Sequence, residues 1–205
     1  MLQIIEKELK MLPQISDFLI YLIAYVIGSI PSGFLIGLLI SNQDIRQKGS
    51  GSVGATNLAR IYGSKIGFIT LIADCSKTFI ALFLAATSAQ SVYIAAFCVT
   101  CGHIFPFWLG FKGGKGVATF FMSLLYLNHY FGIVFCGVWL VMFAICKTSS
   151  IASLISVSIV CALVYIIECG QDFAYYVFAT SLLVVCAHYD NIKRIIRGRE
   201  HGFKK

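Results

Sequence analysis

Two glycine-rich stretches combine a flexible backbone with hydroxyl groups and fixed positive charge. The first reads KGSGSVGATNLAR from Lys48 to Arg60, and the second ends in FKGGKGVAT between Phe111 and Thr119. Glycine lets backbone N–H groups approach a ligand closely, and successive N–H groups form a concavity that attracts anions. Lysine adds a compact charge, and arginine adds a planar fork that fits a phosphate. The two stretches therefore indicate a site for phosphorylated compounds, although cytoplasmic loops that carry lysines for topological reasons would show the same pattern.

Isolated polar residues also stand in or beside apolar sequence. Asp74 and Lys77 are one helical turn apart within an apolar run, so we interpret them first as a structural ion pair and second as site residues. His103, at the end of another apolar run, is interpreted as structural rather than as a base. Asn191 and Arg194 are three residues apart, so on a helix in the C-terminal tail both could face a site formed by the glycine stretches; the alternative is a basic anchor on the cytoplasmic side of the last run.

Two apparent nucleotide-binding motifs and a cysteine pair fail on their context. Residues 49–54 match G-x-G-x-x-G, but they connect two apolar runs instead of following a strand. The glycine and lysine at 114–115 are followed by Gly116, where a P-loop needs Ser or Thr. Cys98 and Cys101 form C-x-x-C without a second ligand pair, and we interpret all eight cysteines as small apolar side chains. No metal and no other cofactor is expected.

The elements that must position these residues are those of a membrane protein. Of the 205 residues, 59% are apolar and 12% are charged, against about 25% charged residues in a typical soluble domain. A helix needs about 20 apolar residues to cross roughly 30 Å of hydrocarbon. The apolar runs are Phe18 to Ile40, Ile66 to Ala86, Ser91 to Phe111, Val117 to Cys146, Thr148 to Ile167 and Phe173 to Tyr189.

Two of these runs depart from a single straight span. Residues 117–146 are too many for one crossing and divide at 128–129, which leaves a first piece of about 11 residues. The segment 28–33 contains a proline between glycines and serines, so the first helix should bend or break near its middle. We therefore predict one domain over residues 1–205. It is an all-α integral membrane protein of about seven transmembrane helices, the first broken near its middle and the fourth short, with glycine-rich cytoplasmic loops.

The charge between the runs predicts the orientation in the membrane. Thirteen of the 16 lysines and arginines fall on one side, in alternate connections and in the C-terminal tail. The positive-inside rule makes that side the cytoplasm, so the N-terminus should lie outside and the C-terminus inside. The net charge of +7 does not indicate nucleic-acid binding, because the chain lacks a soluble scaffold for a basic groove. Anionic membrane lipid and phosphorylated substrates fit the charge better.

The chain resembles the bacterial acyl-phosphate:glycerol-3-phosphate acyltransferases, small multi-span enzymes that begin phospholipid synthesis. The resemblance rests on five blocks in order: Gly28 to Gly33, Gly49 to Arg60, Gly102 to Thr119, Ser150 to Ser153, and His188 to Arg194 with Glu200. It implies transfer of a fatty acyl group from acyl phosphate to the 1-hydroxyl of sn-glycerol 3-phosphate, which gives lysophosphatidic acid and phosphate. It further implies a bacterial inner membrane, an active site facing the cytoplasm, and an upstream enzyme that makes the acyl phosphate.

The resemblance also implies which residues form the site. Ser50, Arg60 and Lys115 are expected to be catalytic. The residues expected to bind substrate or phosphate are Ser32, Gly49, Gly51, Thr56, Asn57, Gly113, Gly114, Gly116, Ser150, His188, Asn191 and Arg194. We expect Lys115 and Arg60 to clamp phosphates, loop N–H groups and Ser50 to support the oxyanion, and a substrate phosphate to accept the hydroxyl proton. No histidine has an aspartate five positions on, as acyltransferases of the usual acyl-CoA kind require.

Three positions depart from the family pattern, and two other functions stay open. The family usually has Asn where this chain has Ser52, a basic residue where it has Tyr189, and Gly where it has Thr78. The departures at Ser52 and Tyr189 keep open a catalytically silent relative that binds lipid. A transporter of phosphate esters would use the same basic loops as an anion gate. Transporters usually show internal repeats and paired broken helices, whereas this chain has one broken run and no repeat.

Overall fold

Helices form the regular structure in the computed structural model, which describes residues 15–86, 92–200 and 202. No strand is present among these residues, which confirms the predicted all-α class. The α-helices are α2 (Ile15–Ser29), α3 (Ser32–Ser41), α4 (Ala55–Tyr62), α5 (Ser64–Ala86), α6 (Val92–Ile104), α7 (Val117–Leu127), α8 (His129–Cys146), α9 (Ser149–Ile167), α10 (Asp172–Ala187) and α11 (Tyr189–Ile196). Two short 3-10 helices are η1 (Ile45–Gln47) and η2 (Phe107–Leu109).

The described residues contain five or six candidate membrane spans, rather than the predicted seven. The five are Phe18–Ser41, Ser64–Ala86, Val92–Leu109, His129–Cys146 and Ser149–Ile167. A sixth exists if α10 and α11, which meet at an angle of 59°, cross as one. The predicted fourth helix is present as α7 and is short, as expected. Its 11 residues extend only about 16 Å, so it does not count as a span.

The first membrane helix is interrupted between α2 and α3, as the sequence predicts. α2 ends at Ser29 and α3 begins at Ser32, because Pro31 lacks an N–H group and its ring disrupts the preceding turn. α2 also packs very closely on α6. A Cβ atom built on Gly28 would lie 2.1 Å from the carbonyl oxygen of Val99, so only glycine allows the two backbones to approach in this way.

The first glycine stretch is only partly a loop, which corrects the expectation of a glycine-rich loop over the whole connection. Residues Ala55–Tyr62 form α4, because this segment has an apolar face with Leu58 fully buried in a small core beneath the stretch. Gly63, with a φ of +93°, ends α4 and allows α5 to start at the next residue. The predicted site residues that α4 carries are Thr56, Asn57 and Arg60.

The main core lies between the helices of the bundle. Buried apolar side chains from α2, α5, α6, α7, α8, α9 and α10 form one cluster, with Leu82, Phe120 and Leu124 among its fully buried members. Large apolar side chains on the outer faces, such as Leu39 and Ile166, are instead strongly exposed. Helices that are apolar on the outside as well as the inside are typical of a bundle surrounded by lipid.

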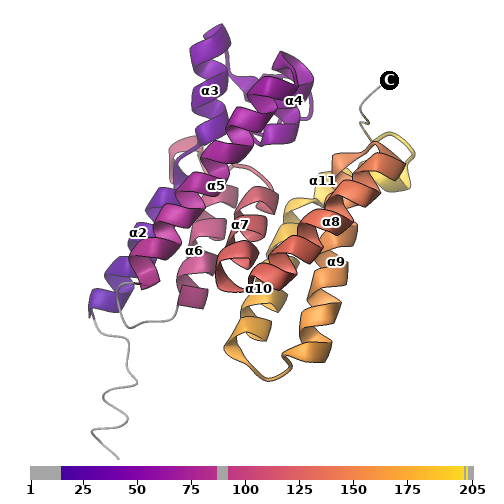
Figure 1. Cartoon of the computed structure of the whole chain (residues 1–205). Helices are drawn as coiled ribbons and strands as arrows, with labels where there is room; N and C mark the ends of the chain where they lie inside the picture. Colours follow the sequence, from indigo (N-terminus) through magenta and orange to yellow (C-terminus); the bar gives the residue numbers. More distant parts are fainter. Residues whose placement is uncertain (1–14, 87–91, 201, 203–205) are drawn as a thin grey trace, which may run out of the picture.

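The polar connections gather at one end of the bundle. Figure 1 shows α3, α4, the junction between α8 and α9, and α11 toward one end, and the connection between α9 and α10 at the other. The segments that carry most of the predicted site residues therefore share one end, although they are far apart in the sequence.

Candidate active site

Asn57 holds the first glycine stretch together. Its buried side chain accepts a hydrogen bond from the N–H of Ser50 at 2.9 Å, and it donates to the carbonyl oxygens of Ser52 at 2.8 Å and Lys48 at 3.2 Å. A Cβ atom on Gly49 would lie 2.2 Å from the Asn57 oxygen, and the φ of Gly49 is +60°, so glycine is required. Asn57, which was expected to bind substrate, thus uses its amide to shape the loop.

The departure at Ser52 lies in the same turn. Its hydroxyl accepts a hydrogen bond from the N–H of Gly54, the N-cap of α4, at 3.2 Å. The N–H of Gly51 donates to the carbonyl oxygen of Lys48 at 3.1 Å. Several N–H groups of this stretch are therefore bonded within it, so side chains become the main candidates for binding an anion.

The second glycine stretch is attached to the end of α6. The N–H groups of Gly113 and Gly114 donate to carbonyl oxygens of α6, each at 3.0 Å. A Cβ atom on Gly114 would lie 2.0 Å from Nε2 of His103, so this position has no room for a side chain. Gly116, with a φ of +79°, is the N-cap of α7. Lys115 therefore stands on a short segment that is fixed on both sides.

Arg46 connects the two stretches. Its Nη1 donates to the carbonyl oxygen of Leu109 at 3.2 Å, and its Nη2 pairs with Asp44 at 2.7 Å. Its guanidinium also lies 5.3 Å from the centre of the Phe34 ring. The segment before the first stretch and the segment before the second are thus joined directly. Arg46 is not among the site residues predicted from the sequence, because the contact links residues that are far apart in the chain.

Glu200 bonds to three of the predicted site residues through one carboxylate. Ser150 and Asn191 donate to its Oε1 at 2.8 and 2.6 Å, and Nε of Arg194 donates to its Oε2 at 2.9 Å. Burial raises the pKa of Glu200, but these three hydrogen bonds and the Arg194 charge outweigh it and hold the pKa below its ordinary value. Glu200 was recognised only as part of the last block and not as a site residue. Its one signal in the sequence is an acid within a basic tail.

Two further contacts join the first glycine stretch to its neighbouring helices. The hydroxyls of Thr56 and Ser149 lie 3.0 Å apart, which joins α4 to the start of α9. Ser149 is the neighbour of Ser150, so the first glycine stretch and the Glu200 cluster meet there. A Cβ atom on Gly33 would lie 1.9 Å from the carbonyl oxygen of Val53, which places the start of α3 against the first stretch.

The remaining predicted residues lie at the edges of this arrangement. Ser32 is the first residue of α3 and is half-buried. His188 is buried at the bend between α10 and α11, where its Nδ1 lies 2.8 Å from the carbonyl oxygen of Val184. Tyr189, which departs from the usual basic residue, has the Lys193 ammonium 4.1 Å from its ring centre. A positive charge therefore still lies beside this position.

Three cations interact electrostatically with the Glu200 carboxylate. Burial lowers the pKa of Lys115 to about 8; the charges of Arg194 and Arg60 add to this effect, whereas Glu200 opposes it. Burial also lowers the pKa of Arg60, on which Glu200 and Arg194 act in opposite directions. Three positive groups thus influence one another around Glu200, and Asp190 adds a smaller negative influence on Lys115. Such an excess of positive charge is suited to binding anions.

Groups suited to a metal ion are not found in the described part of the chain. No three His, Cys, Asp or Glu side chains gather there in a way that could hold one. All eight cysteines are free thiols, and two of them, Cys169 and Cys186, are exposed.

The chain is similar to known glycerol-3-phosphate acyltransferases. The family model of that description matches residues 18–198. A glycerol-3-phosphate acyltransferase from Ehrlichia chaffeensis is 39% identical over 185 residues, which cover 89% of this chain and 94% of that protein. One from Bartonella henselae is 40% identical over an alignment of 206 positions, which covers 94% of each chain.

Two crystal structures of PlsY, an integral membrane glycerol 3-phosphate acyltransferase, are also similar. The glycerol 3-phosphate form superposes with a TM-score of 0.86 at 31% identity, and the lysophosphatidic acid form with a TM-score of 0.83 at 30% identity. Each comparison covers 92% of this chain and 96% of the PlsY chain.

Proposed function

We propose that this chain, which belongs to the glycerol-3-phosphate acyltransferase family, takes its acyl group from an acyl phosphate. It is an integral membrane enzyme that transfers a fatty acyl group to glycerol 3-phosphate and forms lysophosphatidic acid. The observation that supports this donor is the excess of cations, since the charges of Arg60, Lys115 and Arg194 all act in the region of the Glu200 carboxylate, which is itself paired with Arg194. Two phosphate groups at the reacting centre, one on each substrate, would balance that charge.

The proposed reaction needs little from a protein base. The 1-hydroxyl oxygen of glycerol 3-phosphate attacks the acyl carbonyl carbon, the bond from that carbon to the bridging oxygen breaks, and phosphate leaves. The hydroxyl proton passes to an oxygen of a substrate phosphate. Because an acyl phosphate is a mixed anhydride with a good leaving group, orientation and charge stabilisation supply most of the acceleration.

The charged and hydroxyl side chains then divide the work of binding and stabilisation. Lys115 and Arg60 clamp the two phosphates, and the Ser50 hydroxyl donates to the carbonyl oxygen as negative charge develops on it. Glu200 orients Arg194 toward the same space through their ion pair. Loop N–H groups contribute less than the sequence indicates, because several of them are bonded within the two stretches.

The membrane supplies one substrate and the cytoplasm the other. We place the site on the cytoplasmic side of a bacterial inner membrane, with the N-terminus outside and the C-terminus inside, because the basic connections favour that side. The acyl chain enters laterally from the bilayer, past the break between α2 and α3. An enzyme that makes acyl phosphate is the upstream metabolic partner.

Phosphate release by the purified protein in lipid tests this proposal. With palmitoyl phosphate and glycerol 3-phosphate together, we expect release of phosphate and formation of lysophosphatidic acid in equal amounts. Either substrate alone should give none, and palmitoyl-CoA should not replace palmitoyl phosphate. Turnover with palmitoyl-CoA as the better donor would contradict the proposed donor. A folded protein without any turnover would favour the silent lipid-binding relative.

A further inference from the structure

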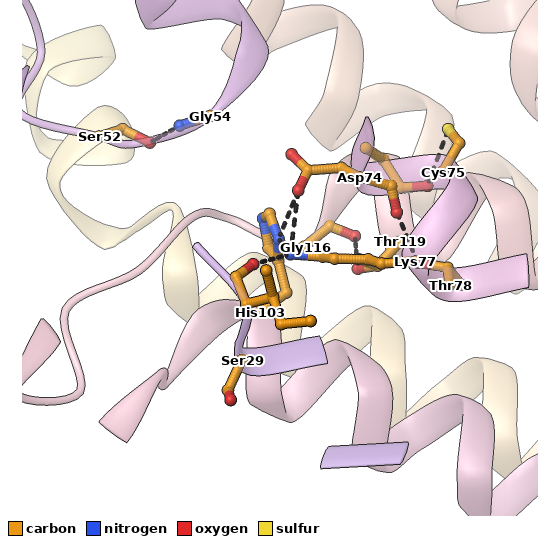
Figure 2. A network of polar contacts seen from close by, with 12 residues as sticks. Ser29, Ser52, Gly54, Asp74, Cys75, Lys77, Thr78, His103, Gly116 and Thr119 are labelled. Carbon is orange, nitrogen blue, oxygen red and sulfur yellow. Dashed lines mark hydrogen bonds and ion pairs between the residues drawn. The ribbon is translucent and has the colours of Figure 1, made fainter. Parts of the chain in front are cut away.

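A second cluster of ionisable side chains is buried within the bundle. Nζ of Lys77 lies 3.0 Å from Oδ1 of Asp74, which confirms the ion pair that the sequence predicts. His103 from α6 joins this pair, with its Nδ1 3.5 Å from the same oxygen and 3.1 Å from Nζ of Lys77. Figure 2 shows one carboxylate oxygen of Asp74 directed at both partners. None of the three side chains is more than 7% exposed.

The cluster reaches the break in the first membrane helix. Nζ of Lys77 donates to the carbonyl oxygen of Ile30 at 2.7 Å. This carbonyl lies in the gap between α2 and α3, where the helical hydrogen bonds are interrupted. A polar backbone group freed inside a membrane needs a partner. Lys77 thus fixes the break, and α3 in turn contacts the first glycine stretch through Gly33 and Val53.

The cluster also supports the second glycine stretch. The carbonyl oxygen of His103 accepts the N–H of Gly114 at 3.0 Å, and the Nε2 side of its ring leaves no room for a Cβ atom on Gly114. The residue after Gly114 is Lys115. The Nδ1 edge of the imidazole ring therefore contacts Asp74 and Lys77. The Nε2 edge packs against Gly114, in the segment that carries the proposed phosphate clamp.

We propose that Asp74, Lys77 and His103 are positioning residues for acyl transfer, which fix the helix break and the second glycine stretch relative to each other and so set the place of Lys115. This inference rests on the proposed role of Lys115. Charges within a membrane are costly, and apolar side chains could hold two helices together more cheaply. A charged cluster that bonds to two functional segments can instead be explained by the precise placement of those segments. A displacement of about 1 Å at a catalytic group costs about 10²-fold in rate.

His103 does not act as the catalytic base in this arrangement. Its Nδ1 faces Asp74 and Lys77, and its Nε2 lies against the backbone of Gly114. A base must come within hydrogen-bonding distance of the substrate hydroxyl, and the position beside Nε2 is already occupied by the loop.

Variants at His103 test the proposal with two readouts. His103→Asn keeps a polar group near the Nδ1 position but loses the ring edge that supports Gly114, and His103→Ala loses both. We expect kcat to fall by about 10²-fold in both variants. The second readout is the pH midpoint at which Lys115 reacts with an amine-specific acylating reagent, followed by peptide mass spectrometry. It should rise from about 8 toward the ordinary value, because a loosened segment lets water reach the amine.

Cys98→Ala is the matched control on the same helix, since Cys98 is half-buried in α6. It should change neither kcat nor the midpoint. A loss of kcat with the Lys115 midpoint unchanged would overturn the proposal and favour a direct catalytic role of His103. An unchanged kcat in a folded His103→Ala protein would overturn it as well. If the native enzyme does not use acyl phosphate, the proposed donor fails, but the Lys115 midpoint still reports on positioning.

A double variant examines the contact itself. Gly114→Ala should lower kcat because the added methyl group meets the His103 ring. His103→Ala removes that ring, so the double variant should be no less active than His103→Ala alone. Losses that multiply in the double variant would show that the ring does not act through Gly114. Size-exclusion profiles and thermal unfolding in detergent establish that each variant is folded.

Discussion

Two charged clusters in this enzyme contain similar groups and differ in balance and exposure. Around Glu200, the charges of three cations act on one another and on the carboxylate, and the Arg194 side chain remains 27% exposed. Around Asp74, one lysine and one histidine share one carboxylate, and the Lys77 side chain is only 7% exposed. The first cluster has more positive than negative groups, whereas the second has its groups paired with one another and bonded to backbone.

The difference accords with the two proposed roles, phosphate binding for the cluster around Glu200 and positioning for the cluster around Asp74. An open cluster with excess charge gains its missing partner when a phosphate arrives. A closed and balanced cluster gains nothing from a ligand, and its hydrogen bonds instead determine where helices and loops lie. Sequence composition does not separate these cases, because both clusters consist of lysine or arginine near an acid. Exposure and the count of opposite charges separate them.

Replacing each lysine by methionine should separate the two clusters most strongly. Lys115→Met should lower turnover by about 10³-fold and leave stability unchanged or higher, since Arg60 and Arg194 disfavour the Lys115 charge. Lys77→Met should instead lower the free energy of unfolding by about 3–5 kcal/mol, because the buried Asp74 loses its lysine partner and the Ile30 carbonyl loses its donor. Phosphate release and denaturant unfolding in detergent measure the two effects. Equal destabilisation by both changes would contradict the distinction between the clusters.

Glu200→Gln should have the next largest effect. The change removes the ion pair with Arg194 and weakens the bonds from Ser150 and Asn191, and we expect kcat/KM to fall by about tenfold to hundredfold. Since Glu200 raises the pKa of Lys115, that pKa should also fall below 8.

Asp190→Asn is the matched control for Glu200→Gln. Asp190 is an exposed acid in the same tail. It also raises the pKa of Lys115, but its effect on that pKa is the smallest among the groups that shift it. We expect kcat/KM to change by less than about twofold, as is usual for exposed charges. Equal losses in the two variants would show that only the net charge of the tail matters, and not the bonds that Glu200 makes.

The pH dependence should sharpen the comparison further. The pKa of Lys115 is lowered from 10.5 to about 8, so its charge is present below pH 8 and is lost as pH rises through that value. Activity that needs this charge should therefore fall by about tenfold between pH 7 and 9. Lys115→Arg keeps its charge over this range and should not show that fall. A native profile that stays flat up to pH 9 would contradict a clamp that depends on the Lys115 charge.

The sequence predicts the parts of this fold that depend on neighbouring residues. The break at Pro31, the short α7 and the pairing of Asp74 with Lys77 all follow from composition or spacing within one helix. Contacts between distant segments are not visible in this way. His103 joins Asp74 only because α5 and α6 pack together, and Glu200 meets Ser150 only because the tail returns to the start of α9. Resemblance to a family points to such residues without giving their partners.

Ser52→Asn should have the smallest effect, because it restores the usual family residue at a position whose role is already filled. The Ser52 hydroxyl accepts a hydrogen bond from the N–H of Gly54. The side-chain oxygen of an Asn accepts the same kind of hydrogen bond in a turn. The loop is held mainly by Asn57, which bonds to three backbone groups. We therefore expect kcat/KM to change by less than about threefold, measured beside the native enzyme at one lipid composition. A gain of tenfold or more would show that this position belongs to the open cluster that binds phosphate, and not to the turn that positions it.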